Sequence, residues 1–478
     1  MSAGFDAAAL SGMAQGVLAV AGDPLMWGLV LLGCVLGMVV GVLPGFGPPA
    51  AMALLFPLVY VLEPLPGITL LAGIFYGAKY GGAVTSILLG VPGEADAVAT
   101  LFEGHPLAQA GRAKQALAAA TLASFTGGMA ATLGLAALAP LLGAAALYFG
   151  PGQRALLMVG ALALVVLLGP GDPRKNLGMV FLGLALALVG LDPVHGAERL
   201  TFGSWRLMNG IELTSLLLGV FGLGDILDTL LTPPAPAPLR PVESAGATSL
   251  VPKSRTAAEN EPVRPSWRLL FPALRGTAIG FATGLVPCGA GMTASFASYA
   301  LEKRLAPDRA RFGRGAWSGL VGPEASNNAA AVASFAPLLL LGLPTNPITA
   351  ALLGALTVGG VVPGPLLPER QPVFYWGLAT SLILGNLLLL FLGLGLARVW
   401  AGLARLPYRL LWPFILLLCL TGSYMGAGGP EGPVQCILFG GLSVLLRRRG
   451  FAPAPLVLAF VLGPNLETHM VQILMGGL

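Results

Sequence analysis

The phrase Gly41-Val42-Leu43-Pro44-Gly45-Phe46-Gly47 interrupts a long apolar stretch of this chain of 478 residues, and Gly284-Leu285-Val286-Pro287-Cys288-Gly289-Ala290-Gly291 interrupts another. A second phrase follows each of them, with Pro92 lying 48 residues after Pro44 and Pro344 lying 57 residues after Pro287. Glycine and proline break helices. Paired interruptions at matching places predict a duplicated membrane protein, and they point to the binding site of a secondary transporter.

The composition indicates a chain that spans a membrane many times. Hydrophobic residues make up 56% of the sequence and charged residues 10%, whereas a soluble domain has about 25% charged residues. Because a spanning helix needs about 20 apolar residues, we expect roughly 12 to 14 helical crossings or half-crossings. The apolar runs are continuous and do not alternate, which disfavours a barrel. The predicted fold is an all-α polytopic membrane protein with broken half-helices and two inverted structural repeats.

A polar segment divides the chain into two membrane halves. Residues 233–266 are rich in proline, alanine, serine and charge, so they bury too little apolar surface to fold. We interpret them as a linker between a first repeat, residues 1–232, and a second repeat, residues 267–478. The excess of basic over acidic residues near the linker favours the cytoplasmic side.

The sequence argues against an enzyme, a metal centre and a nucleic-acid-binding protein. The four cysteines form no CxxC pair and the three histidines form no HExxH motif, so no metal site and no catalytic residue is predicted. An intramembrane enzyme would need a nucleophile with a base, or paired aspartates. The basic residues flank helices, which indicates loop charges and no nucleic acid. A membrane channel or scaffold stays an alternative to a transporter.

The interruptions supply the first group of predicted site residues, whose backbone would contact the solute. Unpaired backbone groups are costly in hydrocarbon, so such a break lines a cavity or lies at a surface. If it lines a cavity, the free amides at the start of the next half-helix attract an anion; the alternative is a tight surface turn. We predict backbone contacts from Gly45, Gly47, Gly93 and Gly289.

Polar side chains beside the interruptions supply the second group. Thr85 and Ser86 offer hydroxyls before Pro92, although small residues there also favour helix packing. Asn327 and Asn328 could hold a carboxylate with their amide nitrogens or a cation with their oxygens; the alternative is that they cap a helix over residues 329–341. Thr345 follows Pro344, where a helix cap is the alternative role.

Two carboxylates are candidates for the coupling cation. Glu324 lies between two apolar stretches, where a charged side chain is costly and marks function by default; its alternative role is an ion pair with a loop arginine such as Arg314. Asp96 closely follows Pro92. Because a carboxylate repels an anionic solute, we expect Glu94 and Asp96 to face solvent, to bind the cation, or to signal a solute that is no plain polycarboxylate.

These phrases together resemble the large membrane subunit of the tripartite tricarboxylate transporters. The motifs of that family match residues 41–47, 80–93, 104–113, 284–287, 298–304, 323–329, 341–344 and 455–464, so the resemblance covers nearly the whole chain. Two departures stand out. Glu94 and Asp96 occupy positions where the family has small neutral residues, and Cys288 replaces a glycine.

The resemblance implies a function and a set of partners. It implies uptake of a tricarboxylate or related carboxylate across the bacterial inner membrane, driven by a Na⁺ or H⁺ gradient and by no other cofactor. A periplasmic solute-binding protein, a small four-helix membrane subunit and the lipid bilayer are the implied partners. A homodimer of the whole complex is one arrangement consistent with these partners. For the transport motion, we favour an elevator movement of one domain over a rocking of the two halves.

Overall fold

The computed structural model of the chain describes residues 3–42, 48–169, 171–192, 195–231, 267–286, 290–396, 399–400 and 412–476. The following positions discussed above lie outside the described residues: Pro44, Gly45, Gly47, Pro287, Cys288, Gly289 and the segment 233–266.

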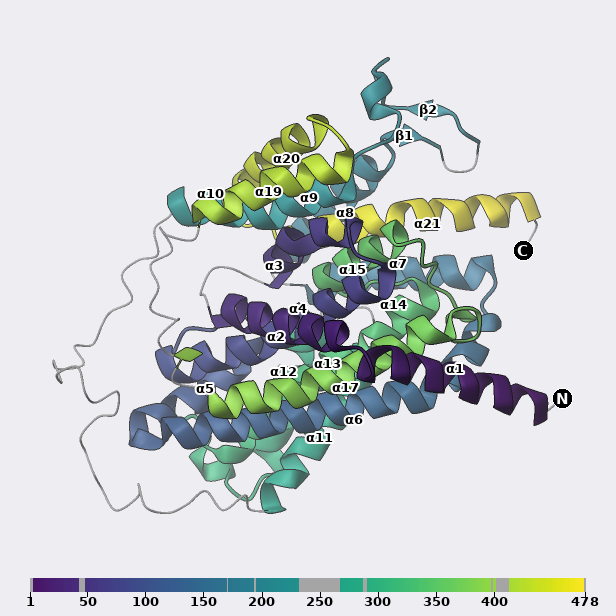
Figure 1. Ribbon diagram of the computed structural model, residues 1–478. Coiled ribbons are helices and arrows are strands. Elements are labelled where there is room, and N and C mark those ends of the chain that lie inside the picture. Colours follow the sequence, from purple (N-terminus) through teal and green to yellow (C-terminus); the bar gives the residue numbers. More distant parts are fainter. Residues whose placement is uncertain are drawn as a thin grey trace.

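Helices dominate the fold (Figure 1). The helices of the first half are α1 (Ala3–Ala21), α2 (Pro24–Val42), α3 (Pro48–Leu55), α4 (Pro64–Leu89), α5 (Val98–Leu107), α6 (Ala113–Leu147), α7 (Pro151–Leu168), α8 (Pro173–Ala187), α9 (Leu213–Leu217) and α10 (Gly224–Leu231). Those of the second half are α11 (Leu270–Gly284), α12 (Ala290–Leu305), α13 (Trp317–Ala333), α14 (Phe335–Leu341), α15 (Pro347–Val358), α16 (Leu367–Arg370), α17 (Pro372–Gly395), α19 (Trp412–Ala427), α20 (Glu431–Arg448) and α21 (Ala454–Gly476). Strands β1 (Gly190–Leu191) and β2 (Glu198–Arg199) pair antiparallel.

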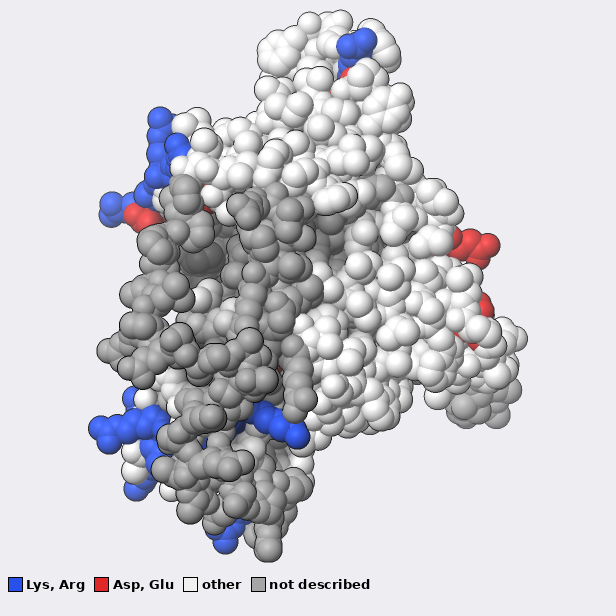
Figure 2. Space-filling model, turned by 60° about the vertical axis from the view of Figure 1, so that its left-hand side comes forward, with Lys and Arg blue, Asp and Glu red and all other residues white. Residues whose placement is uncertain are grey.

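The predicted all-α polytopic membrane fold is confirmed. Among the described residues, five helical segments are long and apolar enough to cross a membrane: Pro24–Val42, Val98–Leu138, Leu213–Leu231, Pro372–Gly395 and Ala454–Gly476. Large apolar side chains such as Phe181, Phe391 and Phe414 are more than 60% exposed, as expected of a surface that contacts lipid. Charged side chains gather near the edges of the face in Figure 2, beside a broad uncharged surface. The number of crossings stays a prediction.

Two helices form the centre of the molecule. The side chains of α4 are buried from Gly67 to Ile87, and those of α13 from Ser318 to Ala333. Helix α2 packs along α4, while α11, α12 and the long helix α6 pack around α13 (Figure 1). Because α4 and α13 are surrounded by other helices, polar groups on them lie in the protein interior and not in lipid.

Glycines let the helices of each central pair approach closely. Three glycines at a spacing of four residues line α2, and three at the same spacing line α11: Gly33, Gly37, Gly41, Gly276, Gly280 and Gly284. A Cβ atom on any of them would lie against a backbone carbonyl of the partner helix, on α4 or α13 respectively. Such small residues at this spacing are typical of close helix pairs in membranes. The two halves therefore share this arrangement; that they are inverted copies stays a prediction.

We expect Gly37→Ala and Gly280→Ala each to lower the free energy of unfolding by about 1–3 kcal/mol, because the added methyl group forces the paired helices apart. Gly28→Ala is the matched control on α2, since a Cβ atom at Gly28 would meet nothing within 4 Å. Thermal unfolding of the purified variants in detergent, followed by circular dichroism, measures the differences. Equal stability of Gly28→Ala and Gly37→Ala would contradict the role assigned to this close contact.

Candidate functional site

The second phrase of each half ends a helix in the same way. Helix α4 ends at Gly90 with φ of 68°, and α14 ends at Gly342 with φ of 66°. Both values lie in the left-handed region that favours glycine as a helix cap. The chain then runs through Pro92 or Pro344 without helical structure before the next helix begins. The predicted interruptions at these two prolines are confirmed.

The break at Pro92 lies next to helix ends of both halves. A side chain at Gly93 would collide with the carbonyl oxygen of Gly41 at the end of α2, so this break packs against the end of α2. A side chain at Gly291, near the start of α12, would collide with the Asp96 carboxylate. The fold therefore places the start of α12 against the segment that follows Pro92.

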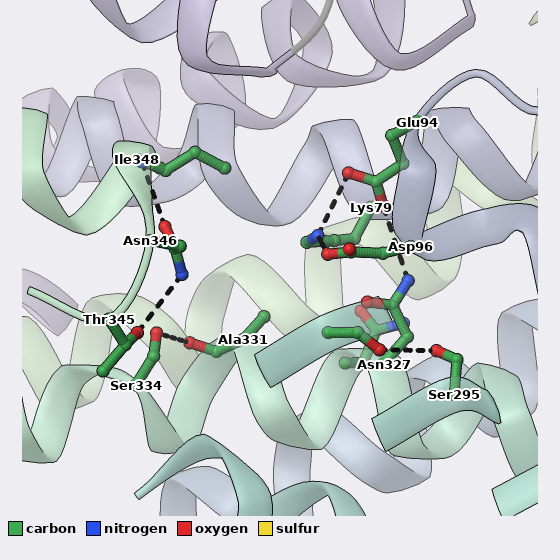
Figure 3. Close-up of polar contacts among 12 residues, drawn as sticks. Lys79, Glu94, Asp96, Ser295, Asn327, Ala331, Ser334, Thr345, Asn346 and Ile348 are labelled. Carbon is green, nitrogen blue, oxygen red and sulfur yellow. Dashed lines mark hydrogen bonds and ion pairs between the residues drawn. The ribbon is translucent and has the colours of Figure 1, made fainter. Parts of the chain in front are cut away.

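A cavity of about 230 Å³ lies where these helix ends meet. The first half lines it with the start of α3, with α4 and with residues 94 and 96, and the second half with the starts of α12 and α15 and with α13. Its walls are mainly apolar, through residues such as Phe75, Met292 and Ile348, while its polar end holds Lys79, Glu94 and Asp96 (Figure 3). A mostly apolar pocket with a few convergent polar groups is the usual form of a small-molecule site.

The polar end of the cavity is a buried ion triad. The Lys79 Nζ atom lies 3.0 Å from Glu94 Oε2 and also contacts Asp96 Oδ2 (Figure 3). The side chains of Lys79, Glu94 and Asp96 are 3%, 5% and 25% exposed. Asp96 is therefore the most accessible member of the triad. With one ammonium group and two ionised carboxylates, the triad carries a net charge of −1.

Lys79 is a site residue that the sequence reasoning missed. It is the only charged residue between Pro64 and Leu89. An ionisable side chain inside a membrane segment is a functional candidate by default, and this signal was available from the sequence. Its two carboxylate partners lie beyond the end of its own helix, so only the turn at Gly90 brings them back to it.

Asn327 is the predicted side chain that lies closest to the triad. Its Nδ2 atom donates to Glu94 Oε1 at 3.4 Å (Figure 3), and its side chain is fully buried. Its Oδ1 atom has no hydrogen-bond partner among the residues that the structure describes. Asn328, one residue further along α13, faces a different set of groups, and neither asparagine is among the residues that line the cavity.

Glu324 belongs to a second polar cluster. Its carboxylate accepts hydrogen bonds from Thr100 Oγ1 at 2.6 Å, Ser124 Oγ at 2.7 Å and Asn328 Nδ2 at 3.4 Å. The alternative ion pair with Arg314 is absent from these contacts, and the segment 323–329 continues α13 instead of capping a new helix. Glu324 and Asn328 are fully buried, but neither is among the residues that line the cavity.

Thr85 and Ser86 use their hydroxyls within the protein. Both donate to the Gly82 carbonyl, at 3.1 and 2.9 Å, and Ser86 also lies within 3.1 Å of the Ala97 carbonyl. Neither residue lines the cavity. Gly93 is also set back from it, because it packs against Gly41 and Thr85.

The start of α15 is capped by its own side chains. Asn346 Oδ1 accepts hydrogen bonds from the backbone amides of Ile348 and Thr349, both at 3.0 Å. Thr349 Oγ1 accepts from the amides of Thr345 and Asn346. These amides are therefore engaged, and Asn346, which lines the cavity, is the polar group that this break presents. Thr345 is buried behind Asn346, from which its hydroxyl accepts a hydrogen bond at 3.3 Å.

Comparisons with known proteins give consistent results. A protein-family model described as "Tripartite tricarboxylate transporter TctA family" matches residues 27–458. An Agrobacterium vitis protein described as "Uncharacterized 52.8 kDa protein in TAR-I ttuC' 3'region" is 42% identical over 92% of this chain and 85% of its own length. A second protein of that organism, "Uncharacterized protein in TAR-II ttuC' 3'region", is 44% identical over 40% of this chain and 79% of its own length. No solved structure matches the chain.

Proposed function

Because this chain belongs to the tripartite tricarboxylate transporter TctA family, we propose that it forms the path by which an organic acid crosses the bacterial inner membrane. The observation that supports this most directly is the cavity, which helix ends from both halves enclose and which holds a single lysine among its lining residues. A buried ammonium group is a natural partner for a carboxylate. The solute class that we propose is a tricarboxylate or a related carboxylate.

The mechanism that we propose is secondary active transport. A Na⁺ or H⁺ gradient drives the uptake, and an elevator motion exposes the cavity to each side in turn. The name of the family describes a tripartite system. We therefore include two partners in the proposal, a periplasmic solute-binding protein and a small four-helix membrane subunit. Of the side chains expected to touch solute, Asn327 has the strongest support, because it bonds to the ion triad at the cavity.

Counterflow tests the proposed function. Membrane vesicles that hold the chain with its partner subunits are preloaded with unlabelled citrate, succinate or lactate, and a trace of the same labelled acid is added outside. A carrier transiently accumulates the label, because each inward step is coupled to an outward step of unlabelled solute. We expect saturable accumulation for at least one of the three acids.

Vesicles from cells without the chain are the control for background leakage. A flux that does not saturate and never accumulates label would support a channel instead. Absence of any flux with all three acids would contradict a carboxylate carrier.

A further inference from the structure

The charge of the cavity creates a problem for an anionic solute. Lys79 already contacts both Glu94 and Asp96, so no positive charge of the triad is left over. A solute carboxylate close to either of these carboxylates would be repelled by it, because like charges repel strongly where the effective dielectric constant is low. Binding of the solute at Lys79 therefore requires that one of the two carboxylates moves away from the ammonium group and loses its charge.

Asp96 is the carboxylate that can give way. Its side chain is 25% exposed, against 5% for Glu94, and it borders the cavity near the start of α12 (Figure 3). Its Oδ2 atom lies beside the point where a side chain on Gly291 would begin, and Asn327 Oδ1 lies 3.1 Å from the same point. Asn327 Oδ1 is buried and accepts no hydrogen bond from any of the described residues. A protonated Asp96 would supply a hydroxyl donor next to this unpaired oxygen.

We propose that the solute carboxylate replaces Asp96 on the Lys79 ammonium group, and that Asp96 takes up the proton that is transported with the solute. This rests on the proposed function and deepens it, because it identifies the coupling cation as H⁺ and assigns its site. On the outer side, Asp96 gains one proton from water as the solute binds. On the inner side, the solute leaves, Asp96 releases the proton and its carboxylate returns to Lys79.

The position of Lys79 favours a proton over a metal cation. The ammonium group contacts both carboxylates and so occupies the place between them that a sodium ion would take. A sodium ion close to the ammonium group would be repelled by it, because both carry a positive charge. A proton on Asp96 adds no such repulsion, because it neutralises the carboxylate.

The other charged groups near Asp96 are engaged elsewhere. On α13, Glu324 accepts from Thr100 and Ser124, and on α5, Glu103 accepts from Tyr299. The first charged residue of α12 is Glu302, which pairs with Arg275 at 2.7 Å. Further titratable groups lie on the elements around Asp96. On α4, Tyr76 contacts Thr132, and the buried hydroxyl of Tyr80 has no hydrogen-bond partner among the described residues. On α5, His105 contacts the Ile87 carbonyl and Gln109.

Citrate uptake into vesicles, with succinate and lactate as parallel probes, tests the proposal. In the wild-type complex, we expect acidification of the outside to stimulate uptake and replacement of Na⁺ by K⁺ to leave it unchanged. In Asp96→Asn, we expect counterflow to persist, because a neutral amide mimics the protonated acid. We expect the stimulation of net uptake by a pH gradient to be lost, because the amide cannot release a proton.

Glu94→Gln and Glu369→Gln are the comparison variants. Glu369→Gln is the control and should behave as wild type, because Glu369 is an exposed residue of α16. Glu94→Gln changes the triad itself and is expected to lower uptake, but the uptake that remains should still respond to the pH gradient, because the proton is assigned to Asp96. Wild-type uptake that follows Na⁺ and ignores the pH gradient would overturn the proposal and leave the proposed function intact. So would an unchanged response in Asp96→Asn, or a loss of the response in Glu94→Gln alone. Absence of counterflow in the wild type would instead remove the proposed function itself.

Discussion

Lys79→Met is expected to abolish counterflow of carboxylates and to lower the free energy of unfolding by about 3–5 kcal/mol, the usual cost of removing one partner of a buried ion pair. The variant leaves Glu94, which is only 5% exposed, with no cation beside it. It also removes the ammonium group that would attract the solute. An attraction of about 4 kcal/mol corresponds to a loss of affinity of roughly 1,000-fold.

Two further variants separate the effect on stability from the effect on transport. Lys79→Met combined with Glu94→Gln and Asp96→Asn removes all three charges, so it should regain much of the stability but none of the counterflow. Lys114→Met removes an exposed lysine of α6 and should behave as wild type. Thermal unfolding in detergent and vesicle counterflow provide the two measurements. Full counterflow in a well-folded Lys79→Met protein would show that Lys79 does not hold the solute.

Glu103→Ala is expected to destabilise the protein by at least about 3 kcal/mol, because several donors lose their acceptor at once. Glu103 on α5 is fully buried. Its carboxylate accepts from Tyr299 Oη at 2.7 Å and from the backbone amides of Gly315 and Ala316 at 2.9 and 2.8 Å. It also accepts from the amide of Gly313. The first half thereby holds the loop that precedes α13, the helix that carries Asn327.

Glu103→Gln is the conservative comparison, because its amide oxygen retains part of the acceptor capacity. It should lose less stability than Glu103→Ala. Glu369→Ala, which shortens an exposed glutamate, controls for the loss of a charged side chain. Thermal unfolding of the purified variants measures each difference, and equal stability of Glu103→Ala and wild type would disprove the role assigned to this carboxylate.

The interruptions of the helices could be predicted from the sequence because their cause is local. Proline lacks the amide donor that a helix requires, and glycine adopts the left-handed conformation that ends one. The helix ends at Gly90 and Gly342 therefore follow from the chemistry of these glycines themselves. The phrases at Pro44 and Pro287 predict interruptions of the same kind. These two prolines lie outside the described residues, so the interruptions there stay predictions.

The partners of the polar side chains could not be predicted in the same way. Asn327 and Asn328 are adjacent in the sequence, yet one bonds to Glu94 at the cavity and the other to Glu324 beside α5 and α6. Successive residues of a helix point in directions about 100° apart, so their surroundings depend on which helices pack on each side. Glu324 finds its donors at Thr100 and Ser124, more than 190 residues away.

The sequence by itself determined that this chain is a helical membrane protein with helices broken at matching places, since hydrophobicity and the backbone chemistry of glycine and proline act locally. Only the tertiary structure decided that helix ends of both halves enclose a cavity and that Lys79 lies between Glu94 and Asp96 at its polar end. The physical reason is that the energy of a buried charge depends on the groups around it in space, and here the close packing of α2 on α4 and of α11 on α13 places those groups.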